Sequence, residues 1–315
     1  MFTKLALSFA VLAALAAAPA AAGDGPLYVT TGGLGVVGGT TRYISSVDGS
    51  SNETQLLAVS TKDGTLTGSL PLVGQWGLPS TPAGAEGLSR DGKKLVLADM
   101  SSGTVSPSLF MVVKTKPLRT VDPITLSGYF SYDAMSPEGS KLYFIQYMRT
   151  DGTVNLGRYI VRAYDLRTNR LLPGRIADRT QKSWVMQGSP VSRTWSADGR
   201  WVYTLYQNPG GYPFIHALDT VRGVAHCVGL PMKNQSGIFN IVLSLHGRTL
   251  SVHWRSGRPF VDVDTASWRV TAAHPGGFDW WWLALAIAPA AALAGGVVLH
   301  RTRAARVKLR PVPGT

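Results

Sequence analysis

A short turn motif that recurs four times along the chain limits the available folds more than any other feature. The clearest copy spans residues 195–203, in which Ser-Ala-Asp-Gly separates two runs rich in apolar residues. Asp accepts hydrogen bonds from nearby amides and Gly adopts positive φ without steric cost, so the motif predicts a tight turn between two strands. The turn residues of the four copies are Asp91 with Gly92, Gly139, Asp198 with Gly199, and Gly247. Four copies indicate a repeat architecture rather than an isolated hairpin.

The spacing of the turn glycines indicates the size of each repeat. Successive turn glycines are separated by 47, 60 and 48 residues, and propeller repeats typically have about 40 to 50 residues in four strands. A second acidic turn recurs in three repeats, at Asp165, Asp219 and Asp264. Residues 27–72 lack the first turn, but they contain four strand-like segments, the first at 27–31. The sequence therefore predicts an all-β chain, a β-propeller of about five four-stranded blades, with six as the alternative.

The two turns together resemble those of a known group of bacterial repeats. Ser-x-Asp-Gly followed by a Lys-x-Leu-Tyr/Val strand, and then an Asp-x-x-Thr turn, is similar to the TolB-like and YVTN-type β-propeller repeats. The resemblance covers about residues 27–273, and it departs from the pattern at His246, where the turn acid is expected. It implies a propeller, usually with more than five blades, and roles that are mainly binding and scaffolding, with some enzymes. The resemblance thus says more about fold than about function.

The N-terminus has the composition of an export signal. Residues 1–22 contain Lys4, then a long apolar run and a final Ala-Ala-Ala. A basic start, an apolar centre and a small-residue end are typical of a secretory signal peptide. We expect cleavage after Ala22, with a retained anchor as the alternative, so that residues 23–277 form an extracytoplasmic propeller.

A second long apolar segment lies near the C-terminus. Residues 280–299 carry no charge, and a helix of this length at about 1.5 Å per residue crosses a bilayer core of about 30 Å. Tryptophans favour the headgroup level, and cations favour the cytoplasmic side. The expected interface residues are Trp280, Trp281, Trp282, Arg301 and Arg303. The sequence predicts a single membrane-spanning helix at 278–300 and a short basic cytoplasmic tail at 301–315, with the propeller outside the cytoplasm.

Charge and cysteine content narrow the classes of partner. The net charge is +13, and several of the cations lie in the C-terminal tail. The remaining lysines and arginines are scattered and form no basic stripe with interleaved aromatic residues, so nucleic acid is not an expected partner. Cys227 is the single cysteine, which excludes an intramolecular disulfide.

Functional residues are expected where the repeat breaks down. Strands in a blade alternate in direction, so the acidic turns share one end of each sheet and irregular loops share the other, where binding residues are commonly found. The expected irregular loops are 48–54, 74–84, 99–107, 149–157, 178–189 and 231–237. Trp76 and Trp184, the latter followed by Gln187, lie on two of them, and Tyr129 and Tyr132 lie on a corresponding entry. These rings could stack on a flat ligand such as a sugar, and packing between neighbouring blades is the alternative.

Motifs for catalysis and cofactor binding were sought and none was found. The chain has no Gly-x-Ser-x-Gly, no His-Glu-x-x-His, no phosphate-binding loop and no cysteine pair. We therefore expect no metal, no cofactor and no catalytic residue. The favoured function is a membrane-anchored binding or scaffold module for envelope proteins or glycans. The alternatives are a hydrolase or lactonase of the propeller kind and a ligand sensor that acts through a membrane partner.

Overall fold

The computed structural model describes residues 29–30, 35–48, 50–100, 107–121, 123–150, 152–180 and 185–273. The predicted signal peptide, membrane helix and tail lie outside these residues. Within the described part of the chain no helix is long and apolar enough to cross a membrane. The chain divides into two compact units, which adjoin in sequence at Ser189 and Pro190.

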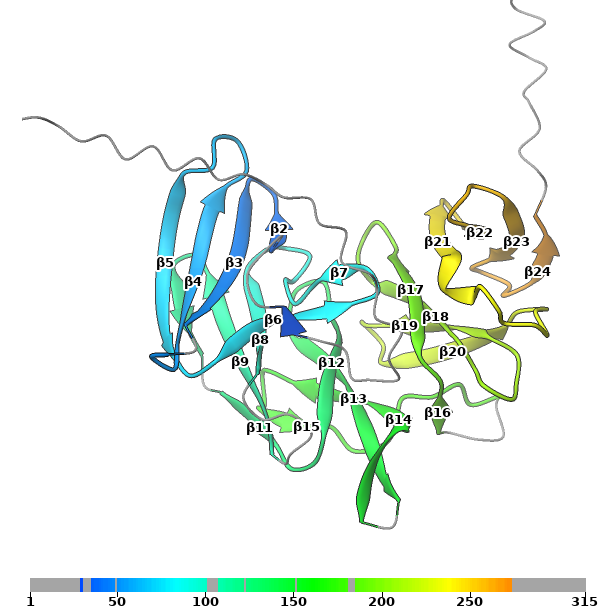
Figure 1. Ribbon diagram of the computed structural model, residues 1–315, viewed down its shortest axis with the longest axis horizontal. Coiled ribbons are helices and arrows are strands. Elements are labelled where there is room, and N and C mark those ends of the chain that lie inside the picture. The colour runs from blue at the N-terminus through cyan, green and yellow to red at the C-terminus, as the bar shows by residue number, and fades with distance from the viewer. Residues whose placement is uncertain are drawn as a thin grey trace, which may run out of the picture. The chain divides into compact units, whose positions relative to one another are not determined.

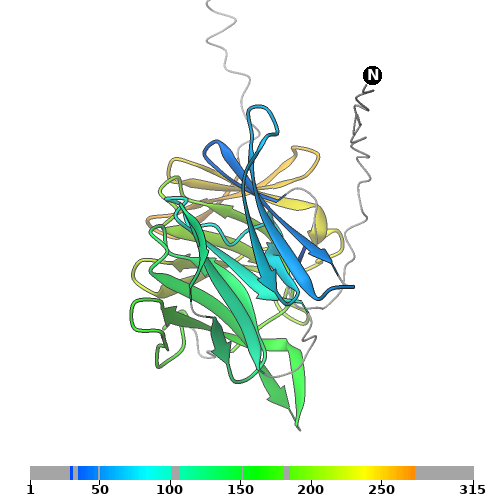
Figure 2. The ribbon, with the colours of Figure 1, turned by 90° about the vertical axis from the view of Figure 1, so that its left-hand side faces the viewer.

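Three antiparallel sheets make up the first unit (Figure 1). The first sheet contains β2 (Val36–Gly38), β3 (Thr41–Asp48), β4 (Glu53–Ser60) and β5 (Leu66–Val73). The second contains β1 (Val29–Thr30), β6 (Trp76–Thr81), β7 (Gly84–Ala85), β8 (Lys94–Asp99), β9 (Ser108–Thr115), β10 (Leu118–Thr120) and β11 (Ile124–Leu126). The third contains β12 (Phe130–Met135), β13 (Lys141–Thr150), β14 (Thr153–Asp165), β15 (Arg170–Leu171) and β16 (Met186–Gln187). Figure 2 shows the long strands β3, β4 and β5 running side by side.

Two four-stranded sheets make up the second unit, and each follows chain order from one strand to the next. The first contains β17 (Pro190–Trp195), β18 (Trp201–Tyr206), β19 (Phe214–Asp219) and β20 (Val224–Gly229). The second contains β21 (Ile241–His246), β22 (Thr249–Trp254), β23 (Pro259–Asp264) and β24 (Val270–Ala272). A 3₁₀ turn, η1 (Ile238–Asn240), joins the two sheets. The all-β class is confirmed, and the five sheets of the chain are consistent with five propeller blades.

The first strand of the chain pairs with a different sheet from the one that the sequence predicts. Residues 27–31 were expected to start the first blade, but β1 pairs with β6 of the second sheet, and β2 takes the expected place. The hairpin between β2 and β3 closes through Gly39, which has a φ of +59°, and Thr40. Closing such a short loop costs less entropy than closing one of about ten residues, so the local hairpin forms instead.

Three of the predicted irregular loops contain regular structure. Residues 74–84 hold β6, which pairs with β8 at Trp76 and Gly77 and is largely buried. Within residues 48–54, Asp48 of β3 pairs with Glu53 of β4, and Asp48 Oδ1 accepts a hydrogen bond of 2.9 Å from the backbone amide of Ser50. Within residues 149–157, Arg149 and Thr150 of β13 pair with Val154 and Thr153 of β14. Glycine, proline and polar residues suggested loops at these places, but backbone pairing overrides local preference.

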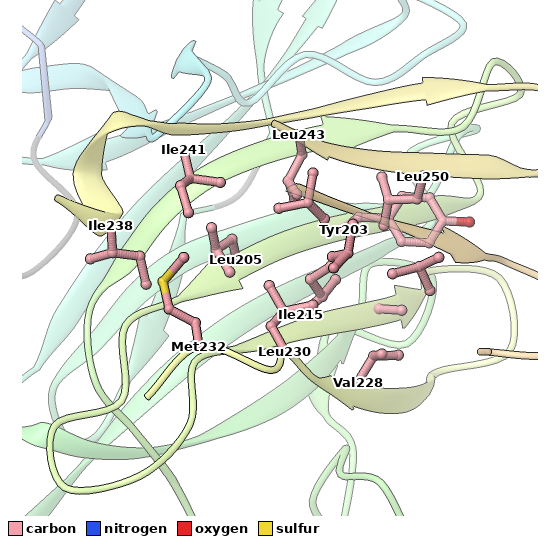
Figure 3. Close-up of a cluster of buried hydrophobic side chains, with 14 residues drawn as sticks. Tyr203, Leu205, Ile215, Val228, Leu230, Met232, Ile238, Ile241, Leu243 and Leu250 are labelled. Carbon is pink, nitrogen blue, oxygen red and sulfur yellow. The ribbon is translucent and has the colours of Figure 1, made fainter. Parts of the chain in front are cut away.

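Packing between the sheets provides each unit with its apolar core. In the second unit, fourteen buried residues form one cluster, with Leu205 and Ile215 from one sheet packed with Ile241 and Leu243 from the other (Figure 3). Burying one such side chain contributes about 1.5–3 kcal/mol. The alternating apolar residues of these strands therefore hold the two sheets together face to face.

Candidate functional site

The two ends of the sheets in the second unit differ, and each end is defined by its connections. The turn end comprises 196–200, 220–223, 247–248 and 265–269. The loop end comprises 207–213, 230–240 and 255–258. Trp268 at the turn end of one sheet stacks on His226, with ring centroids 4.7 Å apart, and meets Trp201 at 5.4 Å, both in the other sheet. The turn ends of the two sheets are therefore adjacent.

The Ser-Ala-Asp-Gly turn satisfies its own hydrogen bonds. Ser196 Oγ donates to Asp198 Oδ1 at 2.5 Å, and the amide of Arg200 donates to the same oxygen at 3.0 Å. Ser196 Oγ also accepts from the amide of Trp201 at 2.8 Å. The hydrogen bond from Ser196 lowers the pKa of Asp198. This carboxylate therefore shapes the turn.

The second acidic turn is tied to the first by an arginine. Nε of Arg200 donates to Asp219 Oδ2 at 3.0 Å, and the side chain of Asp219 is fully buried. Burial is the largest influence on the pKa of Asp219 and would raise it, but hydrogen bonds from Arg200 and from two backbone amides outweigh burial and lower the pKa. Arg248 makes the equivalent contact with Asp264 at 3.2 Å. In the next sheet, however, Gly247 and Arg248 form a two-residue turn, so the fourth motif copy has a different geometry.

The aromatic binding candidates are mostly inside the protein. Trp76 is 7% exposed on β6, where its indole N–H donates to the carbonyl of Val73 at 2.8 Å. Tyr132 is 3% exposed on β12, and Tyr129, just before that strand, is 9% exposed. These three rings pack within the first unit, which fits the packing alternative better than an open stacking platform.

The two remaining candidates lie on the loop before the second unit. Gln187 is exposed on β16, where it pairs with Arg158 of β14. Trp184 lies outside the described residues. The structure therefore does not bring the five predicted binding residues together at one described site.

An open apolar groove of about 660 Å³ lies in the second unit, between the last strands of its two sheets. Its walls come from the end of β20, from β23 and β24, and from the β18–β19 connection. The lining residues are Tyr212, Gly229, Leu230, Pro231, Phe260, Val261, Val270, Thr271 and Ala272. The lining contains no aspartate, glutamate, histidine, lysine or arginine side chain. The groove can therefore receive apolar groups.

Two loops at the groove are held together by the side-chain amide of Gln235, which pairs with the backbone of Asn208. Gln235 Oε1 accepts a hydrogen bond of 2.9 Å from the amide of Asn208, and Gln235 Nε2 donates to the carbonyl of Asn208 at 2.8 Å. Asn208 Nδ2 in turn donates to the carbonyl of Tyr212 at 3.1 Å. This arrangement fixes the backbone at Tyr212, whose ring is 50% exposed at the groove. The site is thus preorganised on one side by polar contacts and lined on the other by edge strands.

The groove is not evident from the sequence, although one of its loops was predicted. Residues 231–237 were expected to be an irregular loop, and they contribute Pro231. The strand residues of the lining, such as Val261 and Val270, look like ordinary edge-strand residues in the sequence. The one local sign of a binding site in the sequence is an aromatic residue, Tyr212, between the turn-forming residues Gly211 and Pro213. Among the residues that the structure describes, no three histidine, cysteine, aspartate or glutamate side chains gather where they could hold a metal ion.

Comparisons with known proteins give a resemblance of fold. No protein-family model matches the chain, and no curated protein does. Solved structures that match include hydrazine synthase of Kuenenia stuttgartiensis (17% identity, TM-score 0.39, 77% of each chain). TolB of Acinetobacter baumannii matches at 13% identity and a TM-score of 0.37 over 73% of this chain and 50% of that chain. BamB of Moraxella catarrhalis matches at 14% identity and a TM-score of 0.38, over 78% of this chain and 64% of that chain.

The chain thus spans about half the length of the TolB structure. At these identities and TM-scores the similarity concerns the fold alone.

Proposed function

We propose that the chain is a five-bladed extracytoplasmic propeller that binds an envelope protein through the apolar groove of its second unit. In this proposal, the helix at 278–300 holds the propeller to the cell membrane in a single pass, with the C-terminus in the cytoplasm. The observation that carries the proposal is the groove itself, which is open, apolar and free of charged lining residues. Apolar pockets with few polar groups are the usual form of a binding site.

The chemistry of the groove favours a protein partner over a glycan. Sugar sites combine stacking rings with several hydrogen-bonding side chains, whereas this groove has one exposed ring, Tyr212, and one hydroxyl side chain besides it, Thr271. The edges of β20 and β24 border the groove, and an extended peptide can pair with an exposed strand edge while its side chains enter a pocket. Neither the hydrolase or lactonase alternative nor the sensor alternative gains a supporting group from the described residues.

Site-specific cross-linking in native membranes tests this proposal. A photo-reactive residue is placed at Thr271 in the groove, and a matched one at Ala266 at the turn end; both positions are exposed. We expect one defined protein adduct from position 271 and none from position 266. Ala272→Glu should weaken the adduct roughly tenfold, because it places an unpaired charge against the apolar partner.

Ala266→Glu serves as the control for the added charge and should leave the adduct unchanged. Equal adducts at both positions, or an adduct that ignores Ala272→Glu, would exclude the groove as the binding site.

A further inference from the structure

Three exposed cations lie in the connections at the loop end of the second unit. Lys233 lies between β20 and η1, and Arg255 and Arg258 lie in the connection between β22 and β23. The connections that define the loop end contain no aspartate or glutamate. This end of the unit is therefore positively charged.

One of these cations lies beside an aromatic ring, and a backbone contact joins two of the connections. The amide of Arg255 donates to the carbonyl of Asn240 at 2.6 Å, which fixes the β22–β23 connection against η1. The guanidinium carbon of Arg258 lies 4.9 Å from the centroid of the Trp254 ring. Phe239 on η1 is 44% exposed. We name these residues the basic aromatic patch: Lys233, Phe239, Trp254, Arg255 and Arg258.

The acids of the described second unit lie away from the patch. Asp198, Asp219 and Asp264 belong to the turns at the opposite end, where two of them pair with arginines. Asp262, on β23, accepts a hydrogen bond of 2.7 Å from Ser251 Oγ. The cations of the patch consequently face solvent without a carboxylate in their own connections.

The chain also leaves the described structure at this end. Strand β24 runs from the turn end toward the loop end and finishes at Ala272. Six residues, 274–279, separate Ala273 from the predicted span at Trp280, and six residues reach about 20 Å at most. A span beginning there would keep the loop end within a short distance of the bilayer surface.

We propose that the basic aromatic patch contacts the anionic headgroups of the membrane in which the chain is anchored. Lysine and arginine near a negatively charged lipid surface are attracted to it, and tryptophan and phenylalanine insert at the headgroup level. The contact orients the second unit with its loop end toward the bilayer, so that the groove faces a membrane-associated partner. The patch and the groove use different side chains, and the proposal does not depend on occupancy of the groove.

Fluorescence quenching in proteoliposomes tests the contact with the full chain. A dye is attached at Ser256→Cys, between Arg255 and Arg258 of the patch, or at Ala266→Cys at the turn end, each in a Cys227→Ser background. Vesicles contain phosphatidylcholine alone or with phosphatidylglycerol, together with a lipid that carries a quencher on its headgroup. We expect several-fold stronger quenching at position 256 than at 266, and only in the anionic vesicles. Salt near 1 M should abolish the difference, because it shortens the Debye length to about 3 Å.

Neutralising the patch should remove the effect. Each cation strengthens contact about fivefold, which is about 1 kcal/mol, so Lys233→Gln, Arg255→Gln and Arg258→Gln together should weaken it about a hundredfold and bring quenching at 256 to the level at 266. The charge-preserving set Lys233→Arg, Arg255→Lys and Arg258→Lys should retain the membrane contact. If the neutral set fails to fold, this set tests whether positive charge at the three positions is enough for the contact.

Two results would overturn the proposal: equal quenching at the two positions, and quenching that does not depend on phosphatidylglycerol. Failure of the chain to float with the vesicles would instead overturn the membrane helix of the proposed function, on which this proposal rests. Because the groove is tested at Thr271 and Ala272, failure of either proposal can be recognised separately.

Discussion

The turn end and the loop end of the second unit use charge in opposite ways. At the turn end, Asp219 and Asp264 are each joined to an arginine and to backbone amides, so the charges serve the turns themselves. At the loop end, Lys233, Arg255 and Arg258 are exposed, and the connections of this end contribute Tyr212, Leu230 and Pro231 to an apolar groove. The residues that repeat along the sequence therefore serve to build the blade. The part that does not repeat is available for a partner.

The largest expected effect is the loss of the buried acid at the turn end. Asp219→Ala leaves Arg200 without its carboxylate and leaves two turn amides, those of Val221 and Arg222, without an acceptor. Removing one partner of a buried ion pair is strongly destabilising, so we expect a loss of about 3 kcal/mol in the free energy of unfolding, measured in urea.

Asp264→Ala is the matched control, because it removes the same turn position and the same kind of arginine contact from an exposed site. Its loss should be clearly smaller. If the two variants were equally destabilised, burial would not be what distinguishes these turns.

A residue with unusual backbone geometry gives the next effect. Trp268 has a φ of +60°, in the left-handed region, at the turn position that Asn169 and Gly223 occupy in the other sheets. Its ring contacts to His226 and Trp201 offset the conformational cost. Trp268→Ala should therefore lose about 2 kcal/mol of stability, and Trp268→Gly should be about 1 kcal/mol more stable than the alanine variant, because glycine accepts this φ.

The neighbouring residue Arg269 provides the reference for this comparison. We expect Arg269→Ala to be more stable than Arg269→Gly, which is the usual order. Thermal unfolding of both variants measures the difference. The same order at Trp268 would mean that the left-handed geometry does not cost stability.

The smallest expected effect is the dependence of stability on pH. Hydrogen bonds from the amide and hydroxyl of Ser267 lower the pKa of Asp264 to about 2, against about 3.9 in an unfolded chain. A lowered pKa contributes stability that is complete above about pH 4 and is lost as the pH falls toward 2. The melting temperature of Asp198→Asn with Asp264→Asn should therefore fall less steeply in this interval than that of the wild type. The neutralised patch variant should keep the wild-type slope, because the patch contains no carboxylate.

Local signals predicted the strands and turns of the second unit well. The tight turn predicted within 195–203 connects β17 to β18, and the acidic turn predicted at Asp219 connects β19 to β20. Alternating apolar residues and an acid-glycine turn act over a few residues, so they can be read locally. The placement of β1 against β6 could not be predicted in this way, because it depends on competition between a short hairpin and a distant pairing.

The candidate site shows the same division. The sequence alone was sufficient for the repeat, the turn carboxylates and the charge of the individual connections, since each depends on residues close together in the chain. The groove required tertiary structure, because Tyr212, Leu230, Phe260 and Ala272 come from four separate segments that meet only when the two sheets pack. The basic aromatic patch likewise combines residues of two connections, which a backbone hydrogen bond between Asn240 and Arg255 joins. Contacts between distant segments are set by packing of the whole unit, and no local pattern encodes them.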